Sequence, residues 1–101
     1  MPTAPNGIVW AIDAGSYGTN NSASTAAGPA ILHAYSASSV ATELWNSSQA
    51  TGGRDTAGNA VKFTVPTVAN GKVYIGTRGS DNTQGGGTTF GEIDVYGLLP
   101  N

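Results

Sequence analysis

The sequence predicts an all-β protein built from repeated antiparallel strands. Short apolar runs alternate with polar residues, and no stretch keeps a period of 3.6 residues, so no helix is expected. Glycine contributes 15 of the 101 residues, and glycine, serine, threonine and asparagine fill the segments between the apolar runs. The dipeptide Asn70-Gly71 separates two such runs, which is the typical signal of a β-hairpin.

Six strands are expected in chain order. The first has apolar residues on both faces and is expected to be buried on both sides. The fourth ends at Pro66, where a missing backbone N–H is tolerated. The expected strands are residues 8–13, 31–35, 42–45, 61–65, 72–77 and 92–96, and the long polar segments 14–28, 46–59 and 78–89 are expected to be loops.

The chain contains an internal repeat. Residues 32–35 align with residues 93–96, so Leu32 and Ala34 correspond to Ile93 and Val95, and this face should be core in both copies. The repeat predicts one unit in residues 1–60, with a hairpin strand, an aromatic strand and a Trp strand, and a second in residues 61–101 that lacks the last strand. At a spacing of 64 residues, Pro2, Asn6-Gly7, Val9 and Trp10 match Pro66, Asn70-Gly71, Val73 and Tyr74. At a spacing of 61 residues, His33 and Tyr35 match Asp94 and Tyr96.

A repeated short antiparallel meander is typical of β-propeller blades. Residues 63–77 resemble the first two strands of a blade in the pyrroloquinoline-quinone-type, or quinoprotein-dehydrogenase-like, propeller repeat. Residues 92–96 resemble the third strand, and residues 34–45 resemble the tryptophan-docking segment of that family. The resemblance implies about two four-stranded antiparallel blades. It also implies a secreted or periplasmic parent protein, although no signal peptide is recognisable at the start of this chain.

Two blades do not close a ring, because propellers have about four to eight. The chain supplies only 18 Leu, Ile, Val and Phe residues, and an open pair of blades would expose apolar faces and unpaired edges. The expected partner is therefore the chain itself, with the ring completed by homo-oligomerisation of three, four or five copies.

Composition argues against several other functions. Four basic residues and a net charge of −2 do not provide the basic stripe that nucleic-acid binding needs. No apolar run approaches the ~20 residues of a membrane-spanning helix. The chain has no cysteine, whereas dehydrogenases of the resembled family use adjacent cysteines, a calcium site and a catalytic aspartate, and no residue here aligns with those calcium ligands or with that aspartate. We therefore expect no enzyme activity, no catalytic, cofactor-binding or metal-binding residues, and no cofactor.

Several residues are candidates for chemistry. His33, the single histidine, would need an acidic partner and a cleft to act as a general base, and a structural polar position between blades is the favoured interpretation. Arg54 and Asp55 are expected to form an ion pair that orders their loop. Four carboxylates lack calcium-loop spacing and are expected to be solvated, namely Asp13, Asp55, Asp81 and Glu92. The glycine run at residues 85–87 lacks the ending of a phosphate-binding loop. Residues 20–22 and 46–48 match glycosylation sequons, which we attribute to chance.

Five large aromatic residues lie on the expected strands. The favoured role is packing between blades, and the alternative is a platform for stacking sugars. These residues are Trp10, Tyr35, Trp45, Tyr74 and Tyr96. The sequence thus predicts a non-catalytic propeller fragment that self-assembles. The alternatives are a carbohydrate- or peptide-binding, lectin-like propeller and a remnant of a quinone-dependent dehydrogenase.

Overall fold

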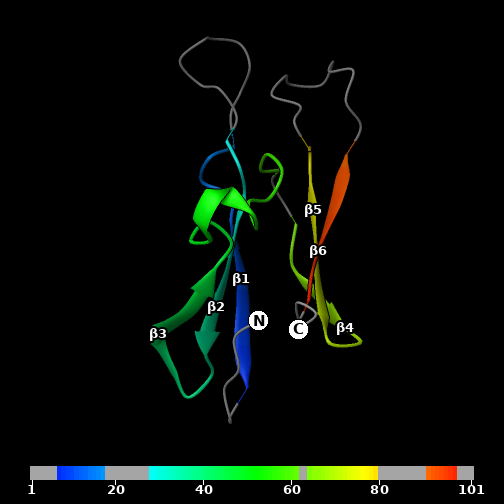
Figure 1. The fold of residues 1–101 in the computed structure, drawn as a ribbon. Helices are drawn as coiled ribbons and strands as arrows, with labels where there is room; N and C mark the ends of the chain where they lie inside the picture. The colour runs from blue at the N-terminus through cyan, green and yellow to red at the C-terminus, as the bar shows by residue number, and fades with distance from the viewer. Residues whose placement is uncertain (1–6, 18–27, 62–63, 80–90, 98–101) are drawn as a thin grey trace.

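The computed structural model describes residues 7–17, 28–61, 64–79 and 91–97, and it confirms an all-β chain. Its strands form two three-stranded antiparallel sheets, sheet 1 in the order β1-β2-β3 and sheet 2 in the order β4-β5-β6, which lie side by side in Figure 1. The one helical element in these ranges is a 3₁₀ turn, Thr51–Gly53. The strands are β1 (Ile8–Asp13), β2 (Ile31–Ser36), β3 (Ser39–Asn46), β4 (Thr67–Ala69), β5 (Lys72–Thr77) and β6 (Glu92–Tyr96).

The hairpin prediction at Asn70-Gly71 is confirmed. Asn70 has φ 53° and Gly71 has φ 72°, the pair of positive values that a type I′ turn requires. The turn brings Ala69 opposite Lys72, and the ladder runs back from there to Thr67. A right-twisted two-residue turn matches the twist of the flanking strands, so this dipeptide fixes the register of sheet 2.

Two expectations about the strands are wrong. The strand expected at residues 61–65 does not form over the described residues of that range, and the partner of β5 is instead Thr67–Ala69. Pro66 has no N–H to donate, so the β4–β5 ladder does not extend past it toward residues 61–65, and β4 begins just after it, at Thr67. The described strands also give three per sheet, not the four expected of each blade.

The internal repeat extends to backbone pairing. In β1–β2, Val9 lies opposite Tyr35, and in β5–β6 the corresponding Val73 lies opposite Tyr96. The same correspondence holds at four further pairs, whereas the Ile8–Ser36 pair of β1–β2 has no counterpart in the β5–β6 ladder. Trp10–Ala34, Ala11–His33, Ile12–Leu32 and Asp13–Ile31 match Tyr74–Val95, Ile75–Asp94, Gly76–Ile93 and Thr77–Glu92. The β1–β2 and β5–β6 strand pairs, which we call the two hairpins, are therefore one structural unit that occurs twice.

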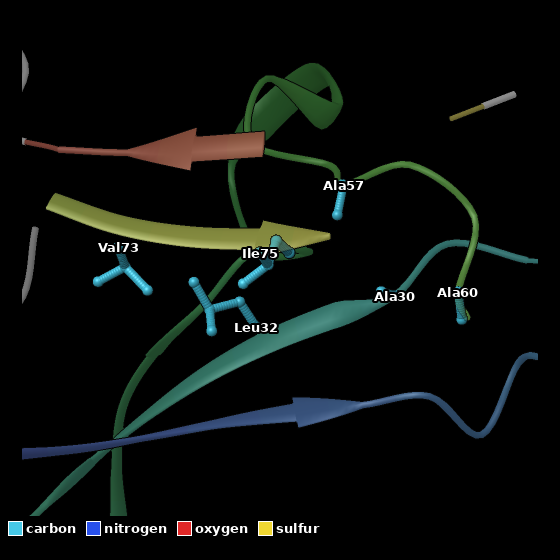
Figure 2. Packing of buried hydrophobic residues seen from close by; sticks show 6 residues of the cluster. All are labelled: Ala30, Leu32, Ala57, Ala60, Val73 and Ile75. Carbon is cyan, nitrogen blue, oxygen red and sulfur yellow. The ribbon is translucent and has the colours of Figure 1, made fainter. Parts of the chain in front are cut away.

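The core lies between the two sheets. The Leu32 side chain points from β2 toward Val73 and Ile75 on β5, and all three are fully buried (Figure 2). Three buried alanines complete the cluster, namely Ala30, Ala57 and Ala60. Among the described residues the large aliphatic members of this cluster are Leu32, Val73 and Ile75.

Three aromatic side chains extend this core. Trp10 meets Trp45 edge-on with ring centroids 6.3 Å apart, and Trp45 meets Tyr96 edge-on at 5.7 Å. Because Trp45 belongs to sheet 1 and Tyr96 to sheet 2, the second contact joins the sheets. Edge-to-face pairs at these distances contribute about 0.5–1.5 kcal/mol each beyond the area they bury.

Residues 55–60 form a connecting strap that is hydrogen-bonded to both sheets. On the side of sheet 1, the Ala30 N–H donates to the Gly58 carbonyl and the Ala60 N–H donates to the Gly28 carbonyl, both at 2.9 Å. On the side of sheet 2, the Asn59 N–H donates to the Gly79 carbonyl at 2.7 Å. A Cβ at Gly58 would collide with Thr77 Oγ1, so only glycine allows this close approach.

Candidate interaction surfaces

The two hairpins stack with unlike faces in contact. We call the front face the one that carries Trp10, Leu32 and Ala34 in sheet 1 and the corresponding Tyr74, Ile93 and Val95 in sheet 2. The back face carries Val9, Ala11, His33 and Tyr35 in sheet 1 and the corresponding Val73, Ile75, Asp94 and Tyr96 in sheet 2. Inside the chain, the front face of sheet 1 packs on the back face of sheet 2. The front face of sheet 2 and the back face of sheet 1 therefore both point outward.

The front face of sheet 2 is an exposed apolar surface. Ile93 is 72% exposed and Val95 52%, whereas their repeat counterparts Leu32 and Ala34 are completely buried. The expectation that this face is core in both copies is confirmed for the first copy and wrong for the second. Sheet 1 occupies the opposite side of sheet 2 and leaves this face uncovered, and Arg54, Asp55 and Thr56 only border it, lining a hollow with Ile93 and Val95. The same reason leaves Val9 42% exposed, so the expected burial of residues 8–13 on both sides is also wrong.

The strand that carries this surface is also an edge strand. β6 pairs with β5 on one side, and no strand among the described residues pairs with its other side. An exposed apolar edge is a template for association with another chain unless charges or bulges protect it. The apolar face and the free edge of β6 therefore make this end of the molecule a candidate interaction surface.

The back face of sheet 1 carries a hydrogen-bonded polar cluster. His33 Nδ1 lies 2.6 Å from Glu43 Oε2, and Asn46 Nδ2 donates to Glu43 Oε1 at 2.8 Å. The hydrogen bond from Asn46, together with the one from His33, holds the pKa of Glu43 below its ordinary value. The His33 ring stacks on Tyr35 with centroids 5.8 Å apart. The single histidine thus has an acidic partner, on an open sheet face.

The sequence did not point to Glu43 and Asn46 as partners of His33. A register shift between Ala34 and Tyr35 on β2 places Glu43 opposite Tyr35 and Asn46 opposite His33. β-bulges of this kind insert a residue into one strand and re-aim its side chains, and they carry no reliable signal in a single sequence.

The corresponding face of sheet 2 carries two carboxylates, the half-buried Asp94 and the exposed Glu92. Asp94, the counterpart of His33, accepts a hydrogen bond from the Gly58 N–H at 3.0 Å. Hydrogen bonding with Asp94, and repulsion by its charge, raise the pKa of the neighbouring Glu92. Tyr96 donates its hydroxyl to the Asp55 carbonyl at 2.8 Å, and burial, with a smaller effect from Asp94, raises its pKa to about 12. Both side-chain contacts bind sheet 2 to the strap.

The predicted ion pair in the loop is confirmed. Arg54 donates from Nε to Asp55 Oδ1 and from Nη2 to Asp55 Oδ2, both at 2.9 Å, and this lowers the pKa of Asp55. A hollow of about 430 Å³ lies beside the pair, next to the Trp45 side chain that joins the sheets. Its lining residues are Leu44, Trp45, Gln49, Ala50, Thr51, Arg54 and Asp55. The lining offers an aromatic ring, an amide and a charged pair.

The other predicted candidates do not gather into a site. Asp13 Oδ1 accepts a hydrogen bond from the Gly15 N–H at 2.7 Å, which closes a local turn. Asp81, the glycine run 85–87 and the sequon 20–22 lie outside the described residues. In the second sequon, Asn46 Oδ1 accepts a hydrogen bond from the Ser48 hydroxyl at 2.7 Å, and its Nδ2 is bound to Glu43. Within the described ranges, no cluster of three or more His, Asp or Glu side chains could hold a metal ion.

Comparisons with known proteins do not assign the chain to a family, so its class is defined by its fold alone. No protein-family model, no curated protein and no solved structure matched the chain. Over the part of the chain that the structure describes, no helix is both long and apolar enough to cross a bilayer. The chain is thus an all-β protein of two stacked three-stranded antiparallel sheets, in which one hairpin unit occurs twice.

Proposed function

We propose that this chain is a non-catalytic structural module that assembles with copies of itself into a closed β-propeller ring. The observation that carries the proposal is the exposed front face of sheet 2, whose counterpart in sheet 1 is the centre of the core. In the first hairpin unit, β1–β2, the front face is buried because sheet 2 covers it. The second unit lacks that cover until another sheet is supplied.

The energetics favour such a cover. Completely burying an isoleucine or valine side chain contributes about 1.5–3 kcal/mol, and Ile93 and Val95 are both more than half exposed in the single chain. Repeat units of this kind generally need about three stacked copies to bury a shared core. Two sheets per chain fall short of that number, and a second copy supplies further sheets of the same composition.

The mass in solution tests the proposal. Size-exclusion chromatography with light scattering, run over a range of concentrations, is expected to give three to five times the chain mass of 10.1 kDa. The circular dichroism of the assembled fraction should be that of a β-protein with a cooperative melt. A folded chain that stays at 10.1 kDa over the whole range contradicts the proposal.

A second candidate function is favoured by the hollow beside Trp45. Sugars and extended peptides bind where an aromatic ring lies next to convergent polar groups, and here Gln49 and the Arg54–Asp55 pair line the same hollow. Titration of the tryptophan fluorescence with hits from a glycan array tests it. Binding that weakens at least tenfold in Gln49→Ala, but not in the distant Tyr74→Phe control, would support this function, and an array without concentration-dependent binding would reject it.

A further inference from the structure

The outward faces of the two sheets match the two faces that already pack against each other. We infer, on the basis of the proposed self-assembly, that copies meet head to tail, with the front face of sheet 2 of one copy stacked on the back face of sheet 1 of the next. The contact between chains then repeats the contact inside each chain, and each copy offers one surface of each kind.

The receiving surface has the composition that this contact needs. The back face of sheet 2, which Leu32 contacts, carries the buried Val73 and Ile75 and the half-buried Tyr96. The same positions on the back face of sheet 1 are Val9, Ala11 and Tyr35, so valine and tyrosine are retained and alanine replaces isoleucine. This surface is therefore apolar at the positions that meet the incoming side chains.

The polar residue on that surface is already paired. His33 occupies the position of Asp94, which lies inside the existing stack and is satisfied by the Gly58 N–H. His33 is correspondingly bound by Glu43, which Asn46 also holds. Covering this cluster therefore leaves the His33–Glu43 contact in place, and burial of a hydrogen-bonded polar group costs far less than burial of an unpaired one.

The incoming surface matches as well. Tyr74 takes the place of Trp10, Ile93 that of Leu32 and Val95 that of Ala34, so each position keeps an aromatic or aliphatic side chain. Since Leu32 packs against Val73 and Ile75 within the chain, Ile93 should lie against Val9 and Ala11 of the next copy. The two surfaces differ from each other, so the interface is heterologous. Such an interface yields rings or filaments rather than a two-fold dimer.

Mixing of two blocked variants tests the head-to-tail arrangement. I93K/V95E disables the front face of sheet 2, and V9K/Y35E disables the back face of sheet 1; each pair of changes leaves the net charge as it is. Each variant alone is expected at the single-chain mass of 10.1 kDa by light scattering. An equimolar mixture is expected to form a two-chain species, because each variant retains the surface that the other needs.

The outcomes separate this inference from the proposed function. If the wild type itself stays at the single-chain mass, both the proposed function and the head-to-tail inference are contradicted. If the wild type assembles and V9K/Y35E still associates with itself while I93K/V95E does not, copies meet through two front faces, and only the head-to-tail inference falls. A mixture that remains at the single-chain mass beside an assembling wild type also overturns it.

Disulfide trapping provides a second test with milder substitutions. The chain contains no cysteine, so introduced thiols have no native competitor. Ile93→Cys mixed with Ala11→Cys is expected to give a covalent two-chain band under mild oxidation, and neither variant alone should do so. Self-linking of Ile93→Cys in preference to mixed linking indicates contact between like faces and overturns the inference. Circular dichroism of each variant verifies that it remains folded.

Discussion

Ser47 and Leu32 are joined by two hydrogen bonds across sheet 1. The Leu32 N–H donates to Ser47 Oγ at 3.0 Å, and the Ser47 N–H donates to the Leu32 carbonyl at 3.0 Å. Both residues are buried, and Leu32 is the centre of the contact between the sheets. A polar side chain just beyond β3 therefore satisfies the backbone of the central core residue.

Ser47→Ala is expected to destabilise the fold. The change removes the acceptor of a buried N–H, and leaving such a donor unsatisfied costs about 1–3 kcal/mol in the free energy of unfolding. The measurement is the midpoint of chemical denaturation. The neighbouring Ser48→Ala is the control, because its side chain lies on the exposed surface and should change the free energy of unfolding by about 0.5 kcal/mol or less. Equal effects of the two changes would contradict the role given to Ser47.

Two counterpart positions of the repeat should respond differently to truncation. Leu32→Ala removes a fully buried side chain and is expected to lower the free energy of unfolding by about 2–5 kcal/mol at every protein concentration. Ile93→Ala should have little effect in dilute solution, because its side chain is 72% exposed there. Its cost should emerge as concentration rises and the front face of sheet 2 becomes covered. Melts recorded over a concentration series distinguish the two, and an effect of Ile93→Ala that is large and independent of concentration would contradict this expectation.

Gly71→Ala is expected to destabilise the hairpin turn between β4 and β5. The ideal Cβ at this position has no atom within 4 Å, so the cost of Gly71→Ala comes from the positive φ of 72° alone. Left-handed backbone costs about 1–2 kcal/mol in a residue with a Cβ. Gly76→Ala is the matched control, since Gly76 lies within β5 and its added Cβ would make only an ordinary contact at 3.6 Å with Thr64 Oγ1. Thermal melting of both variants measures the difference, and an unchanged melting temperature in Gly71→Ala argues against the turn described here.

Two glutamates should affect stability in opposite directions at neutral pH. The folded-state pKa of Glu43 is lowered, so its contribution is present above its ordinary value of 4.5 and is lost as pH falls through the folded value. The folded-state pKa of Glu92 is raised, so its contribution is present below 4.5 and is lost as pH rises through the folded value. Glu43→Gln is therefore expected to lower the melting temperature at pH 7, and Glu92→Gln to raise it.

Both differences should shrink in acid, that of Glu92 below pH 4.5 and that of Glu43 as the pH falls through its lowered folded-state pKa. Melting curves at pH 3 and pH 7 for the two variants and the wild type measure this. The same sign of effect for both glutamates at pH 7 would mean that the hydrogen bonds of Glu43, or the proximity of Glu92 to Asp94, do not persist in solution.

Local signals in the sequence predicted much of the fold. Asn70-Gly71 indicated the hairpin because a type I′ turn needs positive φ at both positions, and alternation indicated the strands that became β1, β5 and β6. The strand expected at 61–65 failed because turn geometry and Pro66, rather than apolar content, determine where the ladder of β4 ends.

The candidate surfaces were less predictable. The alignment of Leu32 with Ile93 in the internal repeat indicated a shared face. Burial of that face depends on which sheet lies across from it, and this is a property of the whole stack. The His33–Glu43 pairing depends on a bulge, and the bond from Leu32 to Ser47 depends on where β3 ends. These contacts join residues distant in sequence through backbone irregularities, which alternation and turn residues do not report.

The strap at residues 55–60 determines how the molecule comes apart. Linear arrays of repeats can fray from one end, since each unit touches only its neighbour. Here one short segment is hydrogen-bonded to both units, so the units cannot separate unless its bonds to at least one of them break. The two halves should consequently melt in a single all-or-none transition, with amide protons of the strap among the last to exchange with solvent.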